Sequence, residues 1–135
     1  MNRIASMIFL AMTLIPASAV GQVCAKQIEV PKYQPVAVAA QSTGSVDLKI
    51  TVGALGQVAR VEASGSSAML VEMTKENVKD WTFCIPKKNE SENVRLRYEY
   101  RLEGARVYPL PNAKVVIDLG AGTVVITSPP MEQGH

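Results

Sequence analysis

The fold is decided by residues 94–102, which read Val94-Arg95-Leu96-Arg97-Tyr98-Glu99-Tyr100-Arg101-Leu102. Apolar and charged side chains alternate over the whole stretch. A period of two is typical of a β-strand that has one buried face and one solvated face. The pattern therefore predicts a strand whose solvated face carries Arg95, Arg97, Glu99 and Arg101.

Two hairpins are predicted on either side of this strand. Residues 46–52 alternate in the same way, residues 53–56 supply turn residues, and residues 58–63 form a returning strand. Further along the chain, residues 115–119 and 123–127 flank a glycine-rich turn and predict a second hairpin.

The period changes to that of a helix between residues 67 and 81. Leu70, Val71, Thr74, Val78 and Trp81 fall on one stripe of such a helix, and a serine at its start can cap it. A shorter helix is expected over residues 36–41. The order of elements predicts an α+β two-layer domain, in which one main helix covers an antiparallel sheet that has an extra C-terminal hairpin. The expected core includes Leu48, Ile50, Leu70, Val78, Trp81, Phe83, Leu96 and Tyr98.

The first 19 residues have the features of a secretory signal peptide. Arg3 gives a positive start, residues 4–15 are largely apolar, and Ala17-Ser18-Ala19 has the small-x-small pattern of a cleavage site. The apolar run would span only about 18 Å as a helix, whereas a bilayer core is about 30 Å thick. We expect a cleaved, periplasmic protein. The alternative is an uncleaved inner-membrane anchor that extends to Val23, and only this form would contact the membrane.

Both cysteines, Cys24 and Cys84, follow the predicted cleavage site. An oxidising envelope favours a disulfide between them. In the chain-entropy model, a loop of this length makes the bond worth at most about 4 kcal/mol. The alternative is two unpaired thiols. Two cysteines are too few for a structural zinc site, and the one histidine is His135, the last residue.

Composition and side-chain inventory argue against an enzyme. The chain has 135 residues, the length of one domain. Its net charge of +2 is too small to indicate nucleic-acid binding. A serine–histidine pair would depend on His135, the carboxylates are scattered, and Gly120 and Gly122 lack the context of a dinucleotide-binding loop. We expect no catalysis, no metal and no cofactor. A small hydrolase is the least favoured interpretation.

The stretch from Pro31 to Leu102 resembles the C-terminal domain of the TonB family of energy transducers. The resemblance lies in short marks that follow one another in a fixed order. They are Tyr33-x-Pro35, Gly44-x-Val46, Gly56-x-Val58, Ser64-Gly65, Leu70, Trp81-x-Phe83 with Pro86, and the final alternating strand. The resulting division is a signal peptide (1–19), a short lead-in (20–30), a TonB C-terminal-like domain (31–104) and a strand-rich extension (105–135).

The resemblance implies a periplasmic protein-binding module. TonB-like domains contact the TonB box, a short peptide of outer-membrane transporters, which adds as a strand beside the last strand of the sheet. The first interpretation is therefore a module that binds an envelope protein, such as a TonB-dependent receptor, by β-augmentation at residues 94–102 and so assists transport. The second is a structural or scaffolding envelope protein that keeps the fold without TonB-box recognition.

Two features depart from the family pattern. A full transducer has a long Pro-rich spacer, whereas at most eleven residues separate Val20 from Pro31 here. Residues 107–127 add a hairpin beyond the family core, and we expect it to pair with the 94–102 strand and block that edge.

The charged face of the 94–102 strand has two interpretations. Arg95, Arg97, Glu99 and Arg101 form either a basic stripe beside an acidic or polar peptide, or a solvated sheet face in which Glu99 relieves the repulsion between arginines.

Overall fold

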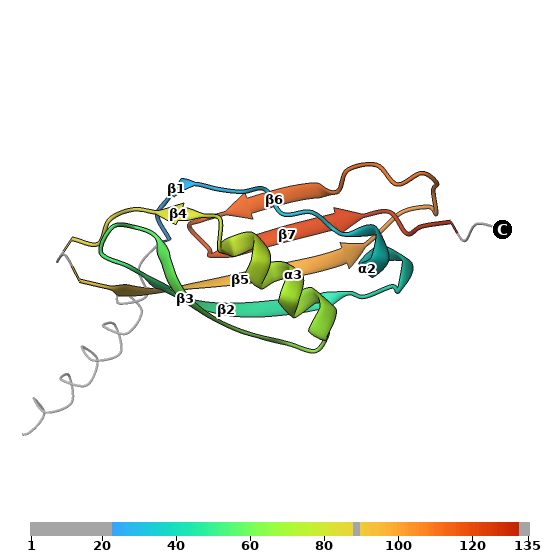
Figure 1. The fold of residues 1–135 in the computed structure, drawn as a ribbon. Helices are drawn as coiled ribbons and strands as arrows, with labels where there is room; N and C mark the ends of the chain where they lie inside the picture. Colours follow the sequence, from blue (N-terminus) through green and yellow to red (C-terminus); the bar gives the residue numbers. More distant parts are fainter. Residues whose placement is uncertain (1–22, 88–89, 133–135) are drawn as a thin grey trace, which may run out of the picture.

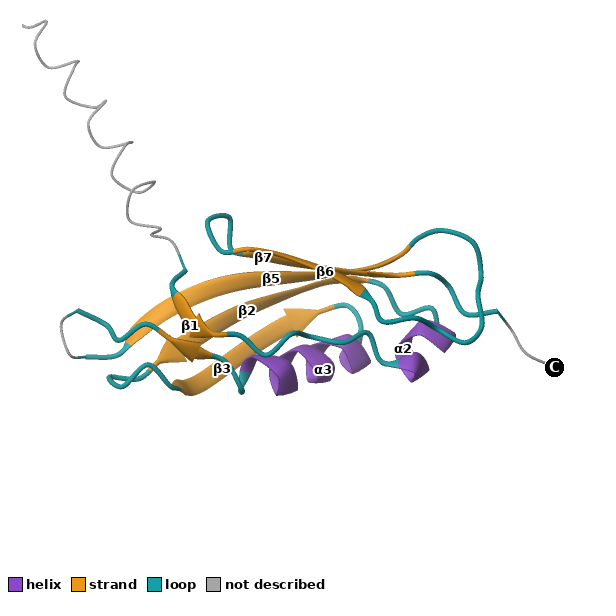
Figure 2. Ribbon diagram, turned by 90° about the horizontal axis from the view of Figure 1, so that it is seen from above, coloured by secondary structure: helices purple, strands orange, loops and turns teal. Residues whose placement is uncertain are grey.

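The structure, a computed structural model, describes residues 23–87 and 90–132. These residues form two layers, with a five-stranded sheet on one side and two helices that cover one of its faces (Figure 1; Figure 2). The predicted α+β class is therefore confirmed. The elements are β1 (Ala25–Gln27), α2 (Pro35–Ala39), β2 (Gly44–Val52), β3 (Val58–Gly65), α3 (Ala68–Val78), β4 (Thr82–Phe83), β5 (Glu92–Leu102), β6 (Lys114–Asp118) and β7 (Thr123–Ser128).

The strands of the main sheet follow the order β3-β2-β5-β7-β6. All neighbouring pairs are antiparallel except β5 and β7, which run parallel. The sequence predicted only antiparallel pairs. The difference arises because residues 103–113, which contain Pro109 and Pro111, are too long for a tight hairpin turn. They carry β6 past the position next to β5, and β7 then returns to fill that position (Figure 1).

The alternating residues divide between the two faces of the sheet as the pattern requires. Leu48 and Ile50 of β2 and Leu96 and Tyr98 of β5 are at most 3% exposed and point toward the helices. In register, Leu48 lies opposite Leu96, which places apolar side chains of both strands in one layer. Each large apolar side chain buried in this way contributes roughly 1.5–3 kcal/mol.

Helix α3 begins at a serine cap, because the Ser67 side chain accepts a hydrogen bond from Leu70 N at 3.2 Å. The helix ends at Val78 rather than at Trp81. The N–H groups of Asp80 and Trp81 bond three residues back, to Asn77 O and Val78 O, which tightens the chain into a turn. Trp81 therefore lies just beyond the helix and reaches the core from this turn.

An aromatic cluster joins the helix end to the sheet. The Trp81 ring lies 5.8 Å from the Phe83 ring and 6.5 Å from the Tyr98 ring, centre to centre. The indole N–H donates to Glu29 O at 3.1 Å and to Asn77 Oδ1 at 3.2 Å. Asn77 Oδ1 also accepts from the Tyr98 hydroxyl at 2.6 Å, so Asn77 links the lead-in, α3 and β5.

A disulfide connects Cys24 to Cys84, with 5.4 Å between their Cα atoms. The predicted pairing is confirmed, and the alternative of two unpaired thiols is wrong. The sequence did not predict the small sheet beside it, in which β1 pairs with β4. Cys84 N also donates to Cys24 O at 2.9 Å. The bond therefore ties the start of the described chain to the strand after α3.

Gly56 explains one of the sequence marks. It has φ +89°, a conformation that side-chain-bearing residues rarely adopt. Its carbonyl accepts the N–H of Phe83 at 2.7 Å, and a Cβ at this position would collide with the carbonyl of Phe83. A glycine is therefore required for β4 to approach the β2–β3 turn.

Three core tyrosines predict loss of stability at alkaline pH. Burial raises the pKa of Tyr33 to about 12 and also raises the pKa of Tyr98 and of Tyr100. An ordinary tyrosine ionises near pH 10. The contribution of these neutral tyrosines to folding stability is therefore complete below about pH 10. It is lost as the pH rises toward the raised pKa values of the folded state. Urea unfolding from about pH 8 to 11.5 should show this decline, and Tyr33→Phe should make it shallower. An unchanged unfolding midpoint above about pH 10 would contradict the expectation.

No helix within residues 23–87 and 90–132 is long and apolar enough to cross a membrane. The predicted signal peptide and the alternative anchor fall on residues 1–19 and on the segment up to Val23, which lie outside the described residues except for Val23 itself. Beyond β7, Met131 forms a β-bridge with Val107, so the stretch after the two prolines is tied to the 105–113 connection.

Candidate functional site

The face of the sheet opposite the helices carries the charged residues predicted as partner-binding. Arg95, Arg97 and Arg101 are exposed and Glu99 is half-buried, and all four point away from α3. No described helix covers this face (Figure 2). The face also contains the alternate residues of β2, because β2 and β5 pair directly. We call it the uncovered face.

Two of the three arginines are held by carboxylates. Arg97 lies opposite Asp47 in register and donates to both of its oxygens, at 2.8 and 3.3 Å. This hydrogen bonding lowers the pKa of the Asp47 carboxyl and raises the pKa of the Arg97 guanidinium. Arg101 forms an ion pair of 2.7 Å with Glu99 on its own strand. These pairs place a carboxylate beside each of the two guanidinium groups.

Arg95 has different neighbours. It lies directly opposite Lys49 in the β2–β5 register, and like charges in that position repel. Glu62 lies opposite Lys49 on the other side, but its carboxylate pairs with Arg60 at 3.1 Å. Among the described residues neither Lys49 nor Arg95 forms an ion pair. We call these two residues the basic pair.

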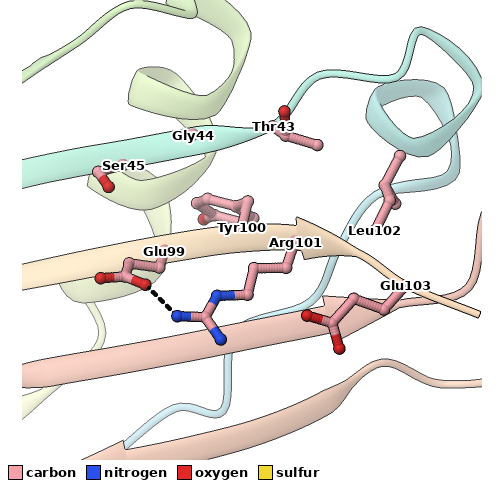
Figure 3. Close-up of a pocket in the computed structure, with 8 residues that line it drawn as sticks. All are labelled: Thr43, Gly44, Ser45, Glu99, Tyr100, Arg101, Leu102 and Glu103. Carbon is pink, nitrogen blue, oxygen red and sulfur yellow. Dashed lines mark hydrogen bonds and ion pairs between the residues drawn. The ribbon is translucent and has the colours of Figure 1, made fainter.

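A hollow of about 400 Å³ lies where β2 begins and β5 ends. It is lined by Thr43, Gly44, Ser45 and residues 99–103. Figure 3 shows Tyr100 on the opposite side of β5 from Arg101, and the Arg101–Glu99 ion pair runs along β5 itself. The hollow is open and is lined by both polar and apolar atoms, so its shape does not enclose a small molecule.

The edge of β5 that does not pair with β2 is occupied by β7 of the same chain. β7 pairs with β5 from Arg97–Thr123 to Leu102–Ser128, and Arg97 N donates to Gly122 O at 2.9 Å. Val124 and Ile126 of β7 are fully buried. The hairpin pairs with this edge as expected, and it is part of the core rather than a loose cover.

The uncovered face presents charged groups that can form ion pairs and hydrogen bonds with a partner. Within residues 23–87 and 90–132 there is no group of three or more His, Cys, Asp or Glu side chains that could hold a metal ion. A two-layer fold with one charged, uncovered sheet face is an arrangement suited to contact with another protein.

Comparison with known families identifies the domain more closely. Residues 29–103 match the model of the Gram-negative bacterial TonB protein C-terminal. The match covers more than half of the chain, and the chain belongs to this family. The family comprises non-catalytic envelope domains of energy transduction and protein interaction. Searches of curated proteins and of solved structures gave no match.

The structure adds residues that the sequence did not single out. Asp47 and Lys49 decide which arginines are neutralised, and Asn77 organises the aromatic cluster. The alternation of β2 and β5 was visible, but their register was not, because the two strands are joined by a long segment that includes α3. Only a register assignment could have placed Lys49 beside Arg95.

Proposed function

We propose that this chain is an exported periplasmic module that binds an envelope protein on its uncovered face, and not by adding a peptide strand to β5. One observation carries the proposal: both edges of β5 are already hydrogen-bonded, to β2 and to β7. To free the β5 edge, the chain would have to expose Val124 and Ile126, which are fully buried. Burial of this kind stabilises by roughly 1.5–3 kcal/mol per side chain.

The disulfide supports a periplasmic location. Cys24 is exposed and Cys84 is half-buried, so reducing agents of the cytosol would have access to the bond. A persistent bond of this kind fits an oxidising compartment. This agrees with export by a signal peptide at residues 1–19 and with the envelope location of the family.

The basic pair supports an acidic contact on the partner. Lys49 and Arg95 repel each other across the β2–β5 ladder, and an opposing carboxylate would relieve this repulsion. Arg97 and Arg101 are already paired and would position a partner rather than attract it. An envelope protein with an acidic segment suits this surface, and TonB-dependent outer-membrane receptors are candidates because the family binds them.

Reversal of the basic pair tests the proposal. The double variant Lys49→Glu/Arg95→Glu should reduce recovery of the partner about tenfold or more, because like charges across an interface cost several kcal/mol. The measurement is quantitative cross-linking of the tagged chain in the periplasm, with a known TonB-dependent receptor as the monitored protein. Lys26→Glu/Lys32→Glu is the matched control. It changes the net charge equally, at exposed lysines outside the sheet face. Equal recovery with both double variants would contradict the proposal.

A second candidate function follows from the family itself, in which a TonB-box peptide pairs with the strand that corresponds to β5. In this chain the peptide would first have to displace β7. The same experiment separates the two candidates. Strand addition depends on main-chain hydrogen bonds, so it would survive reversal of the basic pair. It would also increase the amide exchange of residues 123–128 when the receptor peptide is added.

A further inference from the structure

β6 is the outermost strand of the sheet on the side away from β3. It pairs with β7 along one edge, and no described strand pairs with its other edge. An open edge presents a row of unpaired N–H and C=O groups, which is a template for another strand. The question is which strand the edge of β6 fits.

The two open edges of the sheet differ in how well they are protected. β3 carries Arg60 and Glu62 in its middle, and its register with β2 shifts between Thr51 and Val52. Central charges and irregular pairing both discourage the addition of another strand. β6 has a regular register with β7 and three branched apolar residues at its centre. Val116, the middle one, is 50% exposed on the uncovered face.

The sequence of β6 is complementary to itself when read in the opposite direction. It is Lys114-Val115-Val116-Ile117-Asp118, with opposite charges at its two ends. In an antiparallel pair of two such strands centred on Val116, Lys114 of each copy lies opposite Asp118 of the other. Val115 then lies opposite Ile117. A two-fold axis through the centre makes both halves of the contact identical, as closed dimers require.

We propose that two copies of this chain form a dimer by antiparallel pairing of β6 with β6 in this register. The Lys114–Asp118 match specifies the register, because a shift of two residues places each charge opposite an apolar residue or beyond the strand. Asp118 Oδ1 accepts the N–H of Ala121 at 3.1 Å, which holds the carboxylate at the end of the strand.

The pairing is short, so the dimer is reversible. Five residues per copy bury less than the roughly 1,200 Å² of a standard stable interface. Because β6 lies outside residues 29–103, the dimer belongs to this chain's extension and not to the matched family domain. It is also independent of the function proposed above, since it uses neither Lys49 nor Arg95.

Cysteine cross-linking tests both the contact and its register. Directly opposed Cα atoms in an antiparallel pair lie about 4.5–5.5 Å apart, within disulfide reach. Under mild oxidation Val116→Cys should form a covalent dimer about tenfold faster than Lys114→Cys, because two copies of position 114 would be offset by about 13 Å along the strands. A mixture of Lys114→Cys and Asp118→Cys should cross-link well. Glu62→Cys on β3 is the control for cross-linking by random collision. Like the other variants, it keeps the native disulfide between Cys24 and Cys84.

The results separate the possible occupants of the edge. Equal cross-linking of Val116→Cys and Glu62→Cys overturns the proposal, and so does Lys114→Cys cross-linking as fast as Val116→Cys. Sedimentation of the unmodified protein should show a mass that rises toward the dimer with concentration. If the protein stays monomeric at every concentration up to about 1 mM, the proposal is overturned. The open edge of β6 would then be available to a strand of a different protein.

Discussion

Trp81→Ala is expected to lower the free energy of unfolding by about 3–5 kcal/mol, the range for truncating a large aromatic residue in a core. Trp81 is only 2% exposed and lies between the rings of Phe83 and Tyr98. Alanine would leave a cavity where helix and sheet meet. It would also remove the indole N–H that bonds to Glu29 O and Asn77 Oδ1.

The measurement is urea unfolding followed by far-ultraviolet circular dichroism, because Trp81 is the one tryptophan and its fluorescence is lost with it. Leu55→Ala is the matched control. Leu55 is 77% exposed, and its loss should change stability by no more than about 0.5 kcal/mol. A loss below about 1 kcal/mol for Trp81→Ala would mean that the aromatic cluster does not hold the two layers together.

Removal of the disulfide is expected to be nearly as destabilising. The bonded cysteines are separated by 60 residues, and the chain-entropy model assigns at most about 4 kcal/mol to a loop of that size. We expect Cys24→Ala/Cys84→Ala to cost about 3–4 kcal/mol, including weakened pairing of β1 with β4. The loss should appear as a lower urea midpoint at neutral pH.

Treatment of both proteins with a reductant is the control for this variant. Reduction should destabilise the natural chain by a similar amount and should leave the double alanine variant unchanged. If the double variant loses less than about 1 kcal/mol, the lead-in is held by other contacts. The bonds from Asn77 and Trp81 to Glu29 O would then be the first to examine.

Most of the fold could be predicted because its strands have one buried and one solvated face. The alternation over residues 94–102 located β5, and the serine and the apolar stripe located α3. The parallel pairing of β5 with β7 could not be predicted. The local pattern is the same for either direction, and the choice depends on how residues 103–113 cross the end of the sheet. β1 and β4 were missed because strands of two or three residues have no readable period.

The candidate site was predictable only in part. The sequence indicated that Arg95, Arg97, Glu99 and Arg101 share one face, because their spacing fixes that relation within a single strand. It did not indicate that Asp47 neutralises Arg97 while Lys49 faces Arg95, since those relations depend on register between strands far apart in the chain. A register shift of two residues would place Asp47 opposite Arg95 or Glu99 instead of Arg97.

The bond between Cys24 and Cys84 also determines how the domain would respond to tension on the chain ahead of Cys24. The load would cross the sulfur atoms to Cys84 and reach β5 through the short segment before Glu92, bypassing β2, β3 and α3. The enclosed segment, about 200 Å long if fully drawn out, could not lengthen under the pull. The mechanical resistance of the molecule would then rest on the hydrogen bonds that β5 makes with its two neighbours.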